Sequence, residues 1–347
     1  MHRLIPWLPA LALILCACAA PAPEPATEGA AQPLPDSGTL TVRYIDVGQA
    51  DCALLECGGE FMLIDGGNVA DSDLVVACLE QAGVEALEAV ICSHAHEDHV
   101  GGLPAVLAVY PTEAVYAPTS TYSSKCFDDF MYYVNQQDLT VQIPAPGDSF
   151  SLGDATVTVL GPVKAYADTN NTSLVLRVDF GDTRFLFTGD METDAETDLL
   201  DSGADVRADV LKVGHHGSST STGYRFLYEV DPQYAVISVG TGNSYGHPHE
   251  ETVSRLADAG IVTYRTDLLG TVQAVSDGQT ITFTWENQSA VPDSAEEADT
   301  VYIGNVNSKK LHLPSCSGLP SENNQVVFSS FEEAIAAGYT PCSRCMG

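Results

Sequence analysis

From residue 39 onward, short apolar strand-like segments alternate with amphipathic segments of helical spacing. Residues 39–47 alternate apolar and polar positions, as a half-buried strand does, whereas 73–82 shows the spacing of a helix. Further strands are predicted at 61–64, 89–92, 114–116, 155–160, 173–180, 184–188, 210–213, 234–239, 261–265 and 270–285, and further helices at 192–201, 222–229 and 248–259. Two series of strands interleaved with helices predict two sheets with helices packed outside them, which leaves loops at one edge free for a site.

The N-terminal part of the chain breaks this pattern. Residues 1–18 contain a short positive start and an apolar run that is too short to span a membrane and ends in Leu-Cys-Ala-Cys. This segment resembles a bacterial lipoprotein signal, which implies lipidation of Cys18; an ordinary cleaved signal peptide is the alternative. Residues 19–38 are rich in Pro, Ala and Glu and predict a flexible tether. We therefore expect an exported protein, held on the outer face of the cytoplasmic membrane by this lipid anchor alone.

Composition limits the remaining possibilities. Hydrophobic residues make up 45% of the 347-residue chain, enough for a large core. The formal net charge of -33, from 47 acidic and 14 basic residues, repels polyanions over most of the surface and argues against a general nucleic-acid coat. We expect one large domain at 39–285, a short acidic linker at 286–300 and a segment at 301–347 that is too small to be stabilised by a core alone.

A compact histidine cluster, H-A-H-E-D-H, follows the strand predicted at 89–92. Alternate residues of extended backbone point to the same side, so His94 and His96 can face one metal ion together. Asp98 and His99 fall in the turn into the next helix and can face a second ion. This spacing predicts a two-metal site with these four residues as ligands.

The cluster and the motifs around it resemble the metallo-β-lactamase superfamily of metallohydrolases. The resemblance is narrower still, to the extracellular hydrolase domain of ComEC-type competence proteins. It rests on D-V-G-Q-A-D at 46–51, N-N-T-S-L at 170–174, T-G-D at 188–190, L-K-V-G-H-H-G-S at 211–218 and N-S-Y-G-H-P at 243–248. Ala50 stands where that subgroup usually has glycine. The resemblance covers about residues 39–285 and implies an α/β fold, layered as an αββα sandwich, with metals at the sheet edges.

The resemblance also implies further ligands. Asp190 matches the carboxylate that bridges both metals, and His216 or His215 matches the next ligand, with His216 favoured by the Gly-Ser that follows it. Many members of the superfamily carry another histidine between the first cluster and the bridging aspartate. This chain has none there, and Asn171 and Ser173 stand in that region instead. One metal could therefore have fewer protein ligands or a more open coordination sphere.

The chemistry expected of such a site is hydrolysis. Two divalent ions, zinc or manganese, lower the pKa of a shared water toward neutrality and so supply hydroxide. Asp98 could orient that water while it ligates the second ion. His247, or whichever of His215 and His216 is not a ligand, could protonate the leaving oxygen.

Three further charged residues have two interpretations each. Lys212 precedes the histidine pair and could offset the negative charge of a substrate, or could be an ordinary solvated lysine. Asp51 and Asp65 lie near the same predicted sheet edge and could orient a histidine ligand or serve as turn residues.

The C-terminal segment has a metal site of its own. His312 and Cys316 are followed by the C-x-x-C pair Cys342 and Cys345, with a helix predicted at 329–337 between them. The segment resembles the metal-binding module of the Ada DNA-repair protein, with histidine in place of the first of four cysteines. This implies one structural zinc, and disulfide pairing is the alternative. Nearby basic residues are compatible with nucleic-acid contact: Lys309, Lys310 and Arg344.

The favoured hypothesis is a membrane-anchored, extracellular two-metal hydrolase of phosphodiesters, with DNA as a possible substrate. One alternative keeps the enzyme and changes its substrate to a small or cell-envelope phosphoester or a lactone. A second alternative is a non-catalytic DNA-binding surface protein, which the intact ligand set disfavours.

Overall fold

The computed structural model describes residues 38–293 and 301–346. The predicted signal with Cys18, nearly all of the predicted tether and residues 294–300 of the predicted linker lie outside the described residues. Within the described ranges, no helix combines the length and the apolar character needed to cross a bilayer.

The first sheet has eight strands in the order β15-β14-β1-β2-β3-β4-β5-β6. Strands β15 to β3 pair antiparallel, whereas β3, β4, β5 and β6 run parallel. The carboxyl ends of β3, β4 and β5 therefore meet at one edge. The bounds are β1 Leu40–Tyr44, β2 Ala53–Cys57, β3 Glu60–Ile64, β4 Leu87–Ile91, β5 Thr112–Tyr116, β6 Val141–Gln142, β14 Val272–Ser276 and β15 Ile281–Trp285.

The second sheet has seven strands in the order β13-β12-β11-β10-β9-β8-β7. Here β10, β11, β12 and β13 run parallel and the others antiparallel. The carboxyl ends of the parallel strands again share one edge. The bounds are β7 Ser149–Leu152, β8 Ala155–Gly161, β9 Val175–Phe180, β10 Thr183–Phe187, β11 Val210–Lys212, β12 Tyr234–Ile237 and β13 Val262–Arg265.

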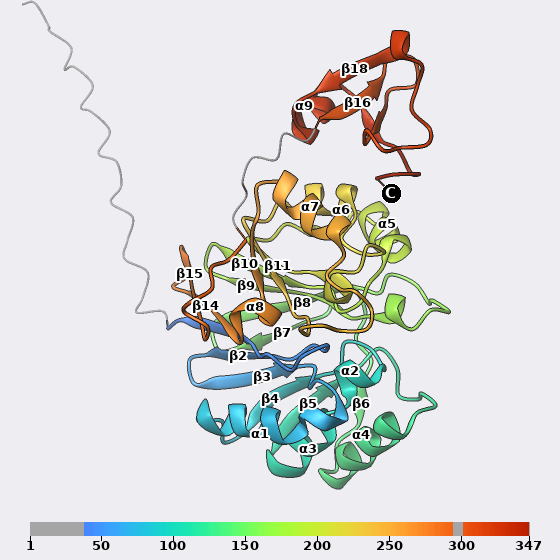
Figure 1. The fold of residues 1–347 in the computed structure, drawn as a ribbon. Coiled ribbons are helices and arrows are strands. Elements are labelled where there is room, and N and C mark those ends of the chain that lie inside the picture. The colour runs from blue at the N-terminus through green and yellow to red at the C-terminus, as the bar shows by residue number, and fades with distance from the viewer. Residues whose placement is uncertain (1–37, 294–300, 347) are drawn as a thin grey trace, which may run out of the picture. The chain divides into compact units, whose positions relative to one another are not determined.

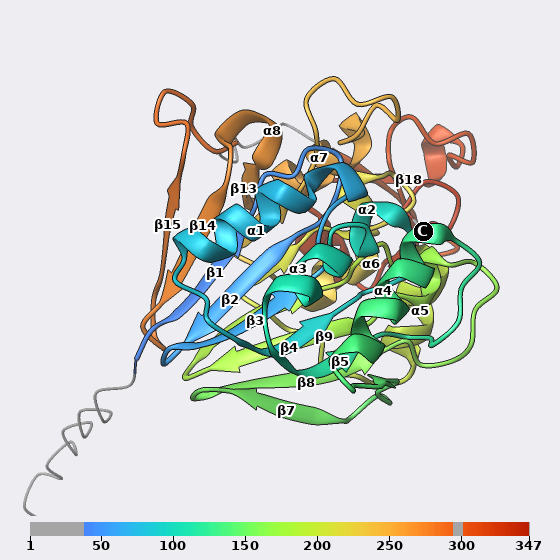
Figure 2. The same cartoon turned by 90° about the horizontal axis from the view of Figure 1, so that it is seen from below.

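Helices cover the outer face of each sheet, so the layers are helix, sheet, sheet, helix (Figure 1). The first sheet carries α1 Ser72–Gln81, α3 Leu103–Val109 and α4 Lys125–Gln136, which Figure 2 shows from their own side. The second carries α5 Thr193–Asp201, α6 Tyr224–Val230 and α7 Glu250–Asp258. Shorter helices are α2 Glu97–Val100, α8 Thr266–Leu269, η1 Val69–Asp71, η2 Asn170–Thr172 and η3 Gly214–Gly217.

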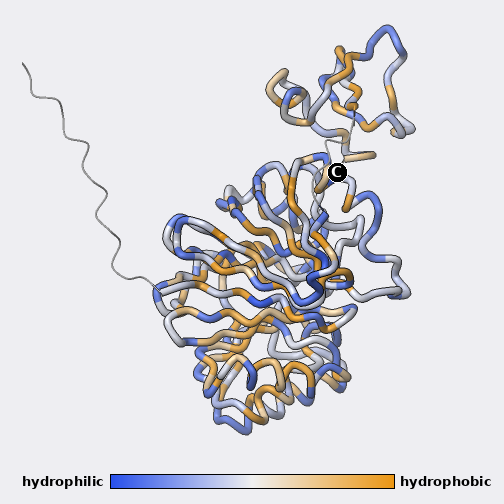
Figure 3. Tube along the Cα trace, turned by 60° about the vertical axis from the view of Figure 1, so that its left-hand side comes forward, coloured by the Kyte–Doolittle hydropathy of each residue, from blue (hydrophilic) through white to orange (hydrophobic). Residues whose placement is uncertain are grey.

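The main core lies between the two sheets. Leu40, Val42 and Tyr44 point into it from β1, at the alternate positions that the sequence pattern predicts. From the second sheet, Val178 and Phe185 meet them. Apolar residues are accordingly concentrated along the strands and polar residues in the connections (Figure 3). The predicted αββα architecture is confirmed.

Two local predictions differ from the structure. The single strand predicted at 270–285 is a hairpin, β14 and β15, because Asp277-Gly278 forms the turn between them. The Asp277 carboxylate accepts the backbone N–H of Gln279 at 2.8 Å, and Gly278 adopts φ +90°, which favours glycine. Residues 286–293 of the predicted linker pack onto the hydrolase domain, where Asp293 pairs with Thr263.

The C-terminal module has its own four-stranded sheet, in the order β18-β16-β17-β19. Its strands are β16 Tyr302–Asn305, β17 Lys310–His312, β18 Gln325–Phe328 and β19 Thr340–Pro341, with η4 Glu322–Asn324 before β18. Helix α9, Phe331–Ala336, falls within the predicted range 329–337. The Ser330 hydroxyl caps it by accepting the backbone N–H of Glu333 at 3.1 Å.

Candidate metal centre

Three loops converge where parallel strands of the two sheets end. The segment 92–96 leaves β4 and leads into α2, and Asp190 follows β10. His215 and His216 follow β11 within η3. Both of these histidines adopt left-handed backbone, with φ of 49° and 52°, a conformation that costs about 1–2 kcal/mol per residue outside glycine. Backbone strain of this kind is concentrated at functional sites.

The first group of ligand atoms, called site A, comprises His94, His96 and Asp190. The Nε2 atom of His94 lies 3.0 Å from Nδ1 of His96 and 3.7 Å from Oδ2 of Asp190. Ligand atoms around one tetrahedral zinc ion are about 3–4 Å apart, given bonds of about 2 Å. Site A therefore has the spacing of a metal site.

The second group, called site B, comprises Asp98, His99, Asp190 and His216. The other oxygen of Asp190, Oδ1, lies 3.2 Å from Nε2 of His99 and 3.7 Å from Nε2 of His216. Asp98 reaches the same point, with Oδ2 3.3 Å from Nε2 of His216. One carboxylate thus offers one oxygen to each site.

The atoms that face site B fit a cation. Nε2 of His99, Nε2 of His216 and Oδ1 of Asp190 are all buried and have no hydrogen-bond partner among the described residues. Leaving such atoms unsatisfied is costly, and a metal ion would satisfy all three at once. Burial lowers the pKa of His216, but Asp190 and Asp51 outweigh it and raise that pKa to about 10. The carboxylates therefore favour positive charge at this point.

His215 lies on the site A side of the same carboxylate. Its Nε2 atom is 3.7 Å from Oδ2 of Asp190, and its Nδ1 atom is 3.3 Å from Glu192. A carboxylate behind the ring is the usual way to aim a histidine ligand. His215 and His216 thus flank Asp190, one on each oxygen. His215 therefore lies beside the Asp190 oxygen that faces site A, although its ring is not one of the grouped ligands of that site.

Asp65 holds the His99 ring in place. Its Oδ2 accepts from Nδ1 of His99 at 2.9 Å, which leaves Nε2 facing site B. The same carboxylate accepts the backbone N–H and the hydroxyl of Ser93, both at 2.7 Å. Of the two interpretations of Asp65, the contacts favour orientation of a ligand.

Asp51 has the corresponding role for His216. Its Oδ1 lies 3.2 Å from Nδ1 of His216, which also contacts the carbonyl oxygen of Ser238 at 3.0 Å. Its Oδ2 is 2.8 Å from the ammonium of Lys212, which is only 4% exposed. Burial raises the pKa of Asp51, but Lys212 and His216 outweigh it and hold that pKa below its usual range. Lys212 is thus neither solvated nor directed at a substrate.

Replacing Lys212 with methionine should destabilise the protein by about 3 kcal/mol, because the carboxylate of Asp51 would remain buried without its main partner. The free energy of unfolding in urea measures this. Metal affinity at site B should fall about 10- to 100-fold, since Asp51 orients a ligand. The control is Lys125→Met: Lys125 pairs with Asp129 but is 85% exposed, so its loss should leave the free energy of unfolding nearly unchanged. Equal effects of the two substitutions would contradict this assignment.

Asn171 and Ser173 position the loop that carries Asp190. The Ser173 hydroxyl accepts the backbone N–H of Asp190 at 3.0 Å, and the Asn171 side chain accepts that of Glu192 at 2.9 Å. Gly189 allows the close approach, because a Cβ atom there would lie 2.8 Å from the Ser173 hydroxyl.

A cavity of about 300 Å³ opens over both sites. It is lined by Gln49, His96, Asp98, Asn170, Asp190, His215, His216, Tyr245 and His247. Burial raises the pKa of Asp98, but His99 and His216 outweigh it and lower that pKa to about 2, so its carboxylate is ionised at neutral pH. Burial and the neighbouring His215 and His249 lower the pKa of His247 to about 4. His247 also lies at hydrogen-bond distance from Gln49, and its role as the proton donor stays a prediction.

Three cavity residues have no role in the sequence analysis. Gln49 contacts Nδ1 of His247 at 3.4 Å, and Tyr245 is an exposed part of the cavity lining. Asn170 also lines the cavity, and its Oδ1 is buried without a hydrogen-bond partner among the described residues. All three fall inside the motifs at 46–51, 170–174 and 243–248. These motifs could therefore have indicated all three residues as part of the site. A sequence motif does not show, however, which of its side chains face the cavity.

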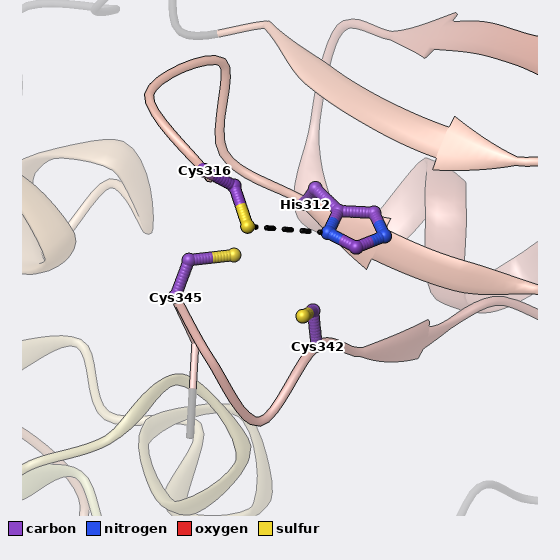
Figure 4. A group of neighbouring side chains, drawn as sticks. All are labelled: His312, Cys316, Cys342 and Cys345. Atoms are coloured by element: carbon purple, nitrogen blue, oxygen red, sulfur yellow. Dashed lines mark hydrogen bonds between the residues drawn. The ribbon is translucent and has the colours of Figure 1, made fainter. Parts of the chain in front are cut away.

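The C-terminal module brings together the four residues predicted to bind zinc. His312, Cys316, Cys342 and Cys345 each offer a ligand atom within 4.8 Å of the other three. Figure 4 shows the four side chains converging, with Nδ1 of His312 3.4 Å from Sγ of Cys316. The backbone N–H of Gly318 also points at that sulfur, at 3.4 Å. All three cysteines are free thiols, so the donor set is that of a closed zinc site.

Two ligand groups that share one carboxylate, at the edge of an αββα sandwich, define a two-metal hydrolase. The chain belongs to the metallo-beta-lactamase superfamily, whose family model matches residues 45–241. A second model, the metal binding domain of Ada, matches residues 286–346. Both family resemblances seen in the sequence are confirmed.

The relatives extend this result. ComE operon protein 3 of Bacillus subtilis is 30% identical over 251 residues, 67% of this chain and 32% of the relative. Competence protein ComA of Neisseria gonorrhoeae is 32% identical over 234 residues, 66% of this chain and 31% of the relative. The chain thus spans about a third of the length of these competence proteins. Among solved structures, the metallo-beta-lactamase fold protein YhfI from Bacillus subtilis aligns with a TM-score of 0.47 and 14% identity, over 71% of this chain and all of that one.

Proposed function

We propose that this protein is a two-metal phosphodiesterase that cleaves nucleic-acid strands outside the cell, to which the lipid on Cys18 anchors it. The catalytic part of this proposal rests on the position of Asp190, whose two oxygens face two separate groups of histidines. The similarity to competence proteins supports a nucleic-acid substrate. The anchor and the location rest on the sequence alone.

The residues present fit two divalent ions, zinc or manganese, with His94, His96 and Asp190 at site A and Asp98, His99, Asp190 and His216 at site B. His215 lies beside site A, 3.7 Å from the Asp190 oxygen that faces it. Ions bound there would lower the pKa of a shared water and polarise a phosphoryl oxygen. Asp98 is ionised and 29% exposed to the cavity, so it can accept a proton or a hydrogen bond from that water. Asp65 and Asp51 keep the ligand histidines oriented.

Charge in the cavity favours a diester over a monoester. Among the described residues, none of those lining the cavity is Lys or Arg, and Lys212 is neutralised by Asp51. The two carboxylates Asp98 and Asp190 already offset part of the charge that two ions bring. A phosphodiester carries one negative charge and a phosphomonoester up to two, so the diester requires less compensation.

The test is a substrate panel on the metal-loaded protein: bis-p-nitrophenyl phosphate, p-nitrophenyl phosphate, a single-stranded oligonucleotide and an aliphatic lactone. We expect kcat/KM for the diester to exceed that for the monoester at least about 10-fold, with cleavage of the oligonucleotide. Faster turnover of the lactone or the monoester would replace this proposal by the small-ester alternative. Absence of turnover on the whole panel would favour the non-catalytic alternative.

A further inference from the structure

One aromatic side chain at the rim of the metal centre has no role in the proposed hydrolysis. Tyr245 lies in the loop between β12 and α7 and lines the same cavity as Asp98 and Asp190. It is 68% exposed. Isolated exposed aromatic residues are common and need no explanation by themselves. Tyr245 differs from such residues in two ways: its ring stacks on rings that lead to the metal centre, and hydrogen bonds fix its loop.

Tyr245 is the outer member of a stack that leads to site B. Its ring lies 5.7 Å from that of His247 with 25° between the planes. The His247 ring in turn lies 6.4 Å from that of His216, a site B ligand, again at 25°. Each ring is therefore stacked, with a tilt of 25°, on the next one. Among the described residues, no second aromatic ring packs on the other side of Tyr245.

Hydrogen bonds fix the backbone of the loop that carries this ring. The side-chain oxygen of Asn243 accepts the backbone N–H groups of both Tyr245 and His247, each at 3.1 Å. The Asn243 amide donates to the carbonyl of Gly240 at 2.9 Å, and Nε2 of His249 lies 3.3 Å from the carbonyl of Tyr245. A planar group that met Tyr245 would meet a surface already in place, which reduces the entropy lost on binding.

The cavity offers few other means of recognition. Its lining includes no Lys or Arg within the described part of the chain, so phosphates beyond the one at the metals would find no cation there. Gln49 and Asn170 contribute neutral amides. A substrate with a ring next to its phosphate can gain affinity by stacking, which needs no charge and tolerates any base.

We propose that Tyr245 is a stacking platform for one nucleobase of a substrate whose adjoining phosphodiester lies at sites A and B. This rests on the proposed function and narrows it to nucleotide diesters with an unpaired base, because a base held in a duplex cannot present its face to the ring. The cavity of about 300 Å³ suits a single nucleotide at a time.

The kinetic test compares two diesters that both release p-nitrophenolate: thymidine 5′-(p-nitrophenyl phosphate) and methyl p-nitrophenyl phosphate. The measured quantity is the ratio of their kcat/KM values, the thymidine diester over the methyl diester. Tyr245→Ala should lower this ratio about 5- to 100-fold, mainly through KM, whereas Tyr245→Phe, which keeps a ring, should change it less than about 3-fold. Tyr132→Ala, which removes a tyrosine of similar exposure on α4, is the control and should leave the ratio unchanged.

A purely structural role of Tyr245 would lower turnover of both diesters alike and leave the ratio unchanged, and this result would overturn the platform.

Titration calorimetry on the metal-loaded protein separates the platform from the proposed function. Thymidine 5′-monophosphate should bind at least about 5-fold more tightly than inorganic phosphate, and Tyr245→Ala should remove that preference. Equal affinities in the unaltered protein would overturn the platform even if diesters are cleaved. If thymidine 5′-monophosphate binds more tightly than phosphate but no diester is cleaved, the stacking proposal stands and the proposed phosphodiesterase activity is wrong.

Discussion

The Asp190→Asn variant should lose the metal of at least one site and its activity, because the amide nitrogen cannot bind a cation and one of the two sites loses its oxygen. Residues that merely orient ligands contribute about 10- to 100-fold to activity or metal affinity. Loss of a ligand shared by two sites should therefore lower kcat/KM for a diester by more than about 100-fold. Elemental analysis of the purified variant and its diester turnover are the two measurements.

The matched control is Asp201→Asn. Asp201 is 62% exposed on α5 and pairs with Arg225 at the surface, so its loss should change stability by about 1 kcal/mol or less and leave the metal content unchanged. An Asp190→Asn protein that kept its full metal content and its activity would show that Asp190 does not join two sites.

The Cys342→Ser variant should lose about one tightly bound zinc per chain and unfold the C-terminal module. The core within the module is small, made of a few buried side chains such as Tyr302, Leu311 and Phe328. Structural zinc in such small modules contributes roughly 10–16 kcal/mol, more than a core of this size supplies. Elemental analysis and the rate of proteolysis within residues 301–346 report the two effects.

Cys78→Ser is the control for this prediction. Cys78 lies on α1 and belongs to no metal-binding group in the described parts of the chain, so zinc content should remain that of the unaltered protein. Turnover of small diesters should survive in both variants, since every ligand of sites A and B lies before residue 217. An unchanged zinc content in Cys342→Ser would contradict the four-ligand site.

The ligands were predictable because their spacing is local. His94 and His96 face one ion because they alternate on extended backbone, and the turn that follows presents Asp98 and His99. The role of Lys212 was not predictable. It lies in a strand in the middle of a covered sheet, and its partner Asp51 lies in the loop between β1 and β2 of the other sheet. Pairing across sheets depends on how they stack, which no sequence window records.

Secondary structure was likewise predictable where the local pattern decides it and not where tertiary packing does. The strand predicted at 155–160 matches β8, because its alternation is strict. Helix α4 was not predicted, although Phe127, Phe130 and Val134 have helical spacing and Ser124 caps the helix. Its aromatic residues also favour strands, so local preference and tertiary structure disagree there. The capping serine was the signal that could have decided it.

The two metal sites join the two sheets. His94 and His99 follow β4 of the first sheet, whereas Asp190 and His216 follow β10 and β11 of the second. Neither sheet alone holds a complete set of ligands, so ions can bind only after the sheets have stacked. A full set of ligands is therefore assembled only when folding is nearly finished, and the ions present in the compartment where that happens decide which metal is bound.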